Sequence, residues 1–215
     1  MKEKFITFEG IEGSGKTTQI RLLKDALVLK GHEVLMTREP GGTPLGDAIR
    51  QIVLHPQYIG MDPRSELLLY GAARAQHVSQ VIEPALVAGK IVLCDRYTDA
   101  TSAYQGNGRG FPHEWIEWIN RVTAYQHKPF LTILLDCPVE KGLSRARLRM
   151  AGEDGMMAED RFERESLAFH EKIRQGYLQL AAKEPKRFVV LNATQSPEKL
   201  HHQIVQIVFE RLGLV

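Results

Sequence analysis

The sequence has little cysteine, little net charge and no long apolar run, and each shortage excludes a class of protein. Only 2 of the 215 residues are cysteine. Cys94 and Cys137 stand in apolar runs, so we expect reduced core thiols and a cytoplasmic protein. Runs such as residues 91–94 are far shorter than the roughly 20 residues that span a membrane, and residues 1–4 lead into a strand rather than a signal peptide. The net charge of +2 predicts no nucleic-acid partner.

Repeats and low-complexity segments are also missing. The 43% of hydrophobic and 25% of charged residues are ordinary for a globular protein. A length of 215 residues is close to that of one domain, so we predict a single domain over residues 1–215. Glycines, acids and methionines without an evident place in a core fill residues 150–158. We interpret this segment as part of a short lid at about residues 145–160.

Short apolar runs alternate with helical patterns along the chain. The runs cover residues 5–8, 34–36, 91–94, 131–135 and 188–191. Helical patterns cover residues 17–30, 45–54 and 63–89, the last with a break expected near Pro84. A final helix is expected to begin with Ser196 as N-cap, followed by Pro197. Apolar strands separated by helices predict an α/β fold, a five-stranded parallel sheet with helices on both faces.

The most specific pattern is GIEGSGKT at residues 10–17, the phosphate-binding loop, which fits GxxxxGK[ST] between a predicted strand and a predicted helix. Its glycines allow backbone N–H groups to curl round phosphate oxygens at a helix N-terminus. We expect Lys16 to be exposed and to reach the β- and γ-phosphates, and Thr17 to ligate Mg²⁺. The predicted ATP-binding residues are Gly10, Ile11, Glu12, Gly13, Ser14, Gly15, Lys16, Thr17 and Thr18.

Other nucleotide-binding classes lack support. A GTPase switch needs DxxG and NKxD elements; no Asp has Gly three residues later, and Asn107, Asn120 and Asn192 are not followed by Lys. A motor or AAA-type ATPase needs a longer chain. A small kinase remains, with a second substrate beside the phosphate-binding loop. Asp95 and Arg96 follow a predicted strand directly and therefore lie at the ligand-binding edge of the sheet. Asp95 can organise Mg²⁺ and Arg96 can clamp an anion; a structural ion pair is the alternative.

Four motifs together resemble the bacterial thymidylate kinase family: FEGIEGSGKTT, TREPGGTPLG, DRYTDATSAYQGNGRG and DRFE. The resemblance covers essentially the whole chain. It implies a P-loop NTPase fold and phosphorylation of dTMP to dTDP with ATP and Mg²⁺, in dTTP synthesis. It also implies a cytoplasmic homodimer.

The resemblance also implies the site. Glu12 touches the acceptor sugar and phosphate, Arg96 holds the dTMP phosphate, Tyr70 stacks on thymine and Arg74 hydrogen-bonds its O4. Tyr104 packs where a ribose 2′-hydroxyl would be. The implied dTMP-binding residues are Glu12, Arg38, Glu39, Arg50, Tyr70, Arg74, Arg96, Thr101, Tyr104 and Gln105, and the implied metal-site residues are Thr17, Asp95 and Glu163. Spacing agrees for Tyr70 and Arg74, which share a helix face, although a core tyrosine and a solvated arginine fit the same spacing.

Some features depart from the family. Ala100 stands where serine is common, Tyr70 where phenylalanine is common, and the lid is longer than in close bacterial relatives. The phosphate-binding loop contains no arginine, so we expect the lid helix to supply the transition-state charge. Arg145 and Arg149, four residues apart, share a face, and Arg149 is the first candidate. The predicted catalytic residues are therefore Lys16, Glu12, Arg96, Arg149 and Arg145.

Two other functions stay open: another P-loop nucleoside or nucleotide kinase, and a nucleotide-binding regulator without phosphotransfer. His32-Glu33 and His113-Glu114 lack the second histidine of a zinc-binding HExxH motif. Trp115 and Trp118, at helical spacing, are expected to pack a helix, against a partner subunit if the protein is a dimer.

Overall fold

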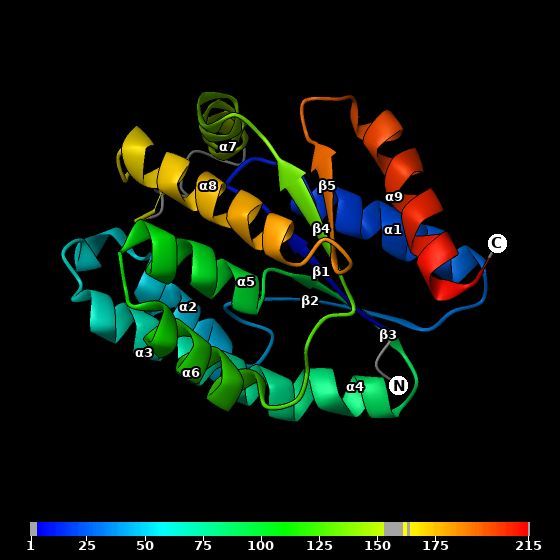
Figure 1. Ribbon diagram of the computed structural model, residues 1–215, viewed down its shortest axis with the longest axis horizontal. Helices are drawn as coiled ribbons and strands as arrows, with labels where there is room; N and C mark the ends of the chain where they lie inside the picture. Colours follow the sequence, from blue (N-terminus) through cyan, green and yellow to red (C-terminus); the bar gives the residue numbers. More distant parts are fainter. Residues whose placement is uncertain (1–3, 153–160, 163, 215) are drawn as a thin grey trace.

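The computed structural model describes residues 4–152, 161, 162 and 164–214, with residues 149–152 described by their backbone only. Five strands form one sheet in the order β2-β3-β1-β4-β5, and every pair is parallel (Figure 1). The strands are β1 (Phe5–Glu9), β2 (Val34–Arg38), β3 (Ile91–Asp95), β4 (Leu131–Asp136) and β5 (Phe188–Asn192). The predicted five-stranded parallel sheet is confirmed.

Burial along the strands follows their place in the sheet. Every residue of the central β1 is buried, and so is all of β3 and β4 except the final aspartate of each. The edge strands β2 and β5 are only partly buried. A parallel sheet covered on both faces requires such apolar central strands, which is why the sequence pattern identified them. The thiols of Cys94 and Cys137 are free and buried, as expected.

Helices cover both faces of the sheet. Helices α1 and α9 pack together on one side, and α8 lies against β4 and β5 on the other (Figure 1). The helices are α1 (Lys16–Leu29), α2 (Pro44–Leu54), α3 (Pro63–His77), α4 (Glu83–Val87), α5 (Thr98–Thr101), α6 (His113–Ala124), α7 (Val139–Gly152), α8 (Leu167–Lys183) and α9 (Pro197–Leu212). Ser196 caps α9 with its side chain and Pro197 follows, as predicted.

Two helical segments contain π-helical turns. The expected helix over residues 63–89 is broken near Pro84, as predicted: α3 is followed by π-helical turns at η3 (Val78–Ile82), and α4 begins beside Pro84. Pro84 has no backbone N–H, so the regular pairing cannot continue through it. A second π-helical segment, η4 (Ser102–Gly108), follows α5 and packs closely on α8. Within the described part of the chain, no helix is both long and apolar enough to cross a membrane.

Candidate active site at the carboxyl ends of the strands

The phosphate-binding loop connects the end of β1 to the start of α1. Gly10, Gly13 and Gly15 all have positive φ, at 134°, 68° and 96°, a region that residues with a Cβ rarely adopt. A Cβ on Gly10 would also lie 2.5 Å from the carbonyl oxygen of Leu135. Glycine is therefore required by backbone conformation and by the close approach of β4, which explains why the motif identified this loop.

Lys16 is buried, with 7% of its surface exposed, so the expectation of an exposed lysine is wrong. Its Nζ donates to the carbonyl oxygens of Gly10 and Ile11, each at 2.9 Å, because the loop curls over the start of α1. Burial and the positive charge of Arg96 lower the pKa of Lys16 to about 8, against the opposing effect of nearby carboxylates. The lysine is thus held inside the loop that would receive the phosphates.

Thr17 and Asp95 meet at the mouth of this loop. The Thr17 hydroxyl donates to Oδ2 of Asp95 at 2.9 Å. Asp95, which ends β3, therefore lies beside the loop, as predicted from its place at the end of a strand. These are the hard oxygen ligands that Mg²⁺ prefers, and Mg²⁺ in kinases takes one or two protein ligands plus phosphates and water. Among the described residues, no group of three or more acidic, histidine or cysteine side chains is arranged so that it could hold a metal ion. Glu163, the third predicted metal residue, lies outside them.

Arg96 contacts the loop through Glu12. Its Nη2 donates to Oε1 of Glu12 at 3.0 Å, and the Tyr104 hydroxyl donates to the same oxygen. The Arg96 guanidinium also lies 4.8 Å from the centre of the Tyr104 ring. Burial alone would raise the pKa of Glu12, but Arg96, with weaker help from hydrogen bonds and Lys16, holds it well below its ordinary value. Arg96 has φ 70°, and strained backbone of this kind is concentrated at functional sites.

Arg74, in α3, is a buried residue of the site. It is 2% exposed, so the interpretation as a solvated charge is wrong. Its Nε donates to Oε2 of Glu39 at 2.8 Å, and its Nη2 donates to Oγ1 of Thr101 at 2.8 Å and to the Tyr97 carbonyl oxygen. Its Nη1 donates to Oδ1 of Asn120. Three predicted dTMP-binding residues, Glu39, Arg74 and Thr101, are therefore in direct contact.

Aromatic side chains form another wall of the site. The half-buried Tyr70 ring lies edge-on to Phe162 at 6.3 Å between ring centres, and Tyr104 lies edge-on to Phe162 at 5.6 Å. Gln105 donates to Oε1 of the fully buried Glu66 at 2.8 Å. Tyr70 and Tyr104 thus share Phe162 as a neighbour, and Gln105 follows Tyr104 in η4.

Three predicted residues lie at the margin of this cluster. The exposed Arg38 pairs with Asp47 at 3.3 Å, and Arg50 donates to the Pro40 carbonyl oxygen at 3.1 Å. Arg145 donates to the Ala193 carbonyl oxygen at 2.9 Å, in the loop between β5 and α9. The side chain of Arg149 lies outside the described residues.

The structure adds residues to which the sequence analysis gave no role. Glu9 accepts from the backbone N–H of Tyr97 at 2.8 Å and from the hydroxyl of Tyr177 at 2.7 Å. Burial, assisted by the charge of Asp99, raises the pKa of Glu9 to about 8. The Tyr177 hydroxyl also accepts from Nη1 of Arg96 at 3.1 Å. The one sequence signal for Glu9 was an acid at the end of an apolar strand.

Glu66 joins the acceptor side of the site to the segment after the lid. Arg161 donates to Oε2 of Glu66 at 2.6 Å, and Arg109 donates to both carboxylate oxygens. Arg161 also donates to the backbone carbonyl oxygens of Val53 and Leu54, through Nε and its backbone N–H respectively. A fully buried carboxylate with these partners fixes the position of Arg161.

Comparisons with known proteins agree with this geometry. The thymidylate kinase family model matches residues 8–204. The thymidylate kinase of Syntrophotalea carbinolica is 58% identical over 93% of this chain and 92% of that protein. The thymidylate kinase of Geotalea uraniireducens is 53% identical over 97% of this chain and 98% of that protein. The crystal structure of thymidylate kinase from Ehrlichia chaffeensis superimposes with a TM-score of 0.75 and 33% identity, covering 95% of this chain and 97% of that one. With its fold, its phosphate-binding loop and its sequence all in agreement, the chain belongs to the thymidylate kinase family.

Proposed function

We propose that this chain transfers the γ-phosphoryl group of ATP to dTMP, giving dTDP and ADP, as a step in dTTP synthesis. The observation that carries the proposal is the contact between Arg96 and Glu12. Through this contact Arg96, a cation that can bind the acceptor phosphate, lies beside the phosphate-binding loop, which can bind the phosphates of ATP. Family membership supports the same reaction.

The reaction needs no general base. A phosphate monoester has a second pKa of about 6, so dTMP is mostly dianionic at neutral pH and already nucleophilic. Its phosphate oxygen attacks the γ-phosphorus, the bond from that phosphorus to the β,γ-bridging oxygen breaks, and ADP leaves. The difficulty is to bring two anions together, so positioning and positive charge carry the catalysis. In our proposal Lys16 holds the donor phosphates and Arg96 holds the acceptor phosphate.

We assign Mg²⁺ to Thr17 and Asp95, whose hydroxyl and carboxylate meet at the mouth of the loop. The bound ion would neutralise charge between the β- and γ-phosphates.

Thymine recognition is assigned to Arg74, with Tyr70, Thr101 and Gln105. Four N–H groups of Arg74 donate to protein acceptors, and a guanidinium has five, which leaves one on Nη1 for a base oxygen. The remaining acceptor-site roles, those of Arg38, Glu39 and Arg50, follow the family.

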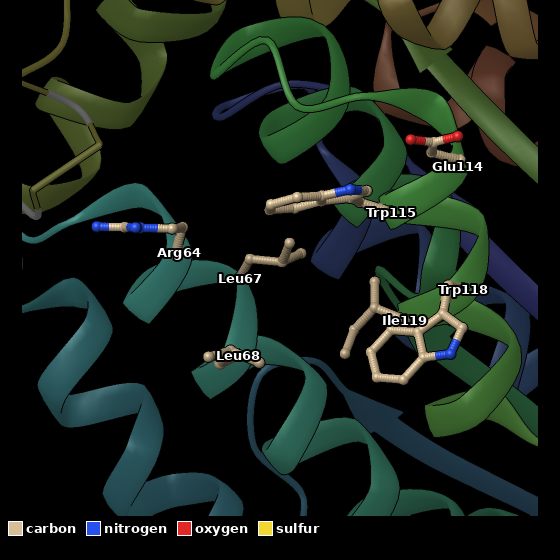
Figure 2. A pocket seen from close by; sticks show the side chains of 7 residues that line it. All are labelled: Arg64, Leu67, Leu68, Glu114, Trp115, Trp118 and Ile119. Atoms are coloured by element: carbon tan, nitrogen blue, oxygen red, sulfur yellow. The ribbon is translucent and has the colours of Figure 1, made fainter.

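We propose that the protein acts as a homodimer and that α3 and α6 form the interface. An apolar groove of about 480 Å³ lies between these helices, lined by Arg64, Leu67, Leu68, Glu114, Trp115, Trp118 and Ile119 (Figure 2). Trp115 and Trp118 are 49% and 53% exposed and Leu68 is 60% exposed. A second copy of the same face would bury them. Light scattering should give about twice the chain mass of 24.3 kDa, and Trp118→Glu should shift the protein to monomer.

Two further assignments follow the family. The reduced state of two buried free thiols supports a cytoplasmic location. The substrates are ATP and dTMP, with no role for nucleic acid.

An ADP-release assay tests the reaction. We expect release to require dTMP and not to occur with thymidine, because a nucleoside lacks the phosphate that Arg96 would hold. Turnover of thymidine, or of another nucleoside monophosphate in preference to dTMP, would favour a different P-loop kinase. ATP binding without turnover of any acceptor would favour a regulator.

A further inference from the structure

His170, in α8, contacts two separate parts of the active site with one imidazole ring. The side chain is fully buried, at 0% exposed. Its Nε2 donates to the carbonyl oxygen of Phe162 at 3.0 Å. Its Nδ1 lies 3.4 Å from Oε2 of Glu12. The ring therefore joins the segment that follows the lid to the phosphate-binding loop.

The two partners of His170 determine where its protons lie. A carbonyl oxygen only accepts hydrogen bonds, so Nε2 must carry a proton. Within the described part of the chain, neither Nδ1 nor Oε2 of Glu12 has a hydrogen-bond partner. With Nδ1 unprotonated, two buried acceptors would face each other, which is unfavourable. A second proton on Nδ1 places a positive charge 3.4 Å from Oε2 of Glu12, so the geometry favours an imidazolium paired with that carboxylate.

The other charged and titratable groups around Glu12 do not bind its Oε2, the oxygen that faces His170. Arg96 after β3 and Tyr104 in η4 both donate to Oε1. Lys16, at the start of α1, donates to carbonyl oxygens of the loop instead. Arg96 and Lys16 disfavour a third positive charge at this site, whereas the Glu12 carboxylate, with Oε2 3.4 Å from Nδ1, favours it.

We propose that His170 is a positioning residue for Glu12, keeping a positive partner on Oε2 while Arg96 turns to the phosphate of dTMP. The inference rests on the proposed roles of Glu12 and Arg96. Arg96 donates to Glu12 in this structure, so an incoming phosphate competes for the same guanidinium. A largely buried carboxylate that loses its direct ion-pair partner is strongly destabilised. With His170 in place, Glu12 keeps a counter-charge and Arg96 is available to substrate.

Two amide variants separate the two contacts of the ring. Asparagine places its amide nitrogen near the position of Nδ1 and can still donate to Glu12. Glutamine places its amide nitrogen near Nε2 and can still donate to Phe162. We expect H170Q to raise the KM for dTMP about tenfold, with the KM for ATP within about twofold of the unmodified protein. We expect H170N, which keeps a donor toward Oε2 but not the positive charge, to raise the KM for dTMP by no more than about threefold. His202 is exposed on α9, and H202Q is the matched control.

The test combines steady-state kinetics with NMR of the unmodified protein. Equal effects of H170Q and H170N, or a parallel rise in both KM values, would mean a structural role and overturn the proposal. If the variants do not fold, two-bond ¹⁵N–¹H correlation spectra at about pH 7.5 still decide it. We expect His170 to be protonated on both nitrogens; a neutral ring protonated only on Nε2 overturns the proposal. An unmodified protein inactive on dTMP would overturn the proposed function and this role together, whereas a neutral ring in an active kinase overturns the role of His170 alone.

Discussion

Gly13 of the phosphate-binding loop and Gly142 of α7 meet backbone to backbone. A Cβ on Gly13 would overlap the carbonyl oxygen of Gly142, and a Cβ on Gly142 would lie 2.5 Å from the carbonyl oxygen of Glu12. No side chain fits between the two segments. The helix that carries the lid arginines therefore rests directly on the loop that receives the phosphates, and a displacement of one segment displaces the other.

Gly142→Ala should impair nucleotide binding without unfolding the protein. The added methyl group meets backbone at Glu12 and the Ile11 side chain, so the loop or α7 must move by some tenths of an ångström. We expect kcat/KM for ATP to fall at least about tenfold. Ser144→Ala, at an exposed position in the same helix, is the control. Unchanged kcat/KM for ATP in the Gly142 variant would show that α7 can shift without cost.

The pH dependence of ATP capture should report the burial of Lys16. Its pKa of about 8 means that in the free protein the lysine loses its charge above pH 8. Since kcat/KM reports the free enzyme, the value for ATP should fall above that pH, whereas kcat should hold to higher pH because bound phosphates favour the charged lysine.

Glu9, with a pKa of about 8, titrates in the same range, so a control must separate the two groups. Lys16→Arg keeps a permanent charge; its kcat/KM for ATP is expected to be lower but no longer to fall above pH 8. A profile that falls equally in this variant would assign the effect to Glu9.

Tyr104 should discriminate against ribose. Its ring is nearly buried, at 7% exposed, and its hydroxyl donates to Glu12, so it cannot move aside easily. In the proposed site it fills the space beside C2′, where a 2′-hydroxyl would clash. We expect kcat/KM for dTMP to exceed that for the ribonucleotide by at least about tenfold. Measuring both substrates with Tyr104→Phe, which keeps the ring, tests whether shape is responsible; equal use of the two sugars by the unmodified protein would exclude the role.

The features that could be predicted from the sequence are those that depend on local sequence patterns or on one rule of sheet topology. Glycines at 10, 13 and 15 identified the loop because its backbone has positive φ at these positions, a conformation that strongly favours glycine. The place of Asp95 beside the phosphate-binding loop followed from the rule that ligands bind at the carboxyl ends of parallel strands. Ser196 and Pro197 marked the start of α9 by a local capping preference.

Contacts between distant segments were not predictable in this way. Glu9 and Tyr177 are 168 residues apart and Glu66 and Arg161 are 95 apart, and no spacing rule connects them. Lys16 was expected at the surface because the motif states its partner but not the depth of the loop around it. His170 has no signal at all, since a single histidine in an amphipathic helix fits a core position equally well.

The lid arginines give the last prediction. Arg145 donates to the Ala193 carbonyl oxygen beyond β5, so its loss should act mainly on ATP binding, raising the KM for ATP about fivefold with kcat within about threefold.

The phosphate-binding loop holds no arginine, so Arg149 remains our candidate for stabilising the negative charge that develops on the transferring phosphoryl group. Arg149→Ala should lower kcat by on the order of 10³ and leave dTMP affinity intact, as for arginine fingers. Arg147→Ala is the control, because two residues along a helix turn the side chain about 160° from that face. Single-turnover rates and dTMP binding separate the cases: normal turnover in Arg149→Ala, or dTMP affinity falling as steeply as the rate, would require the charge to come from another residue.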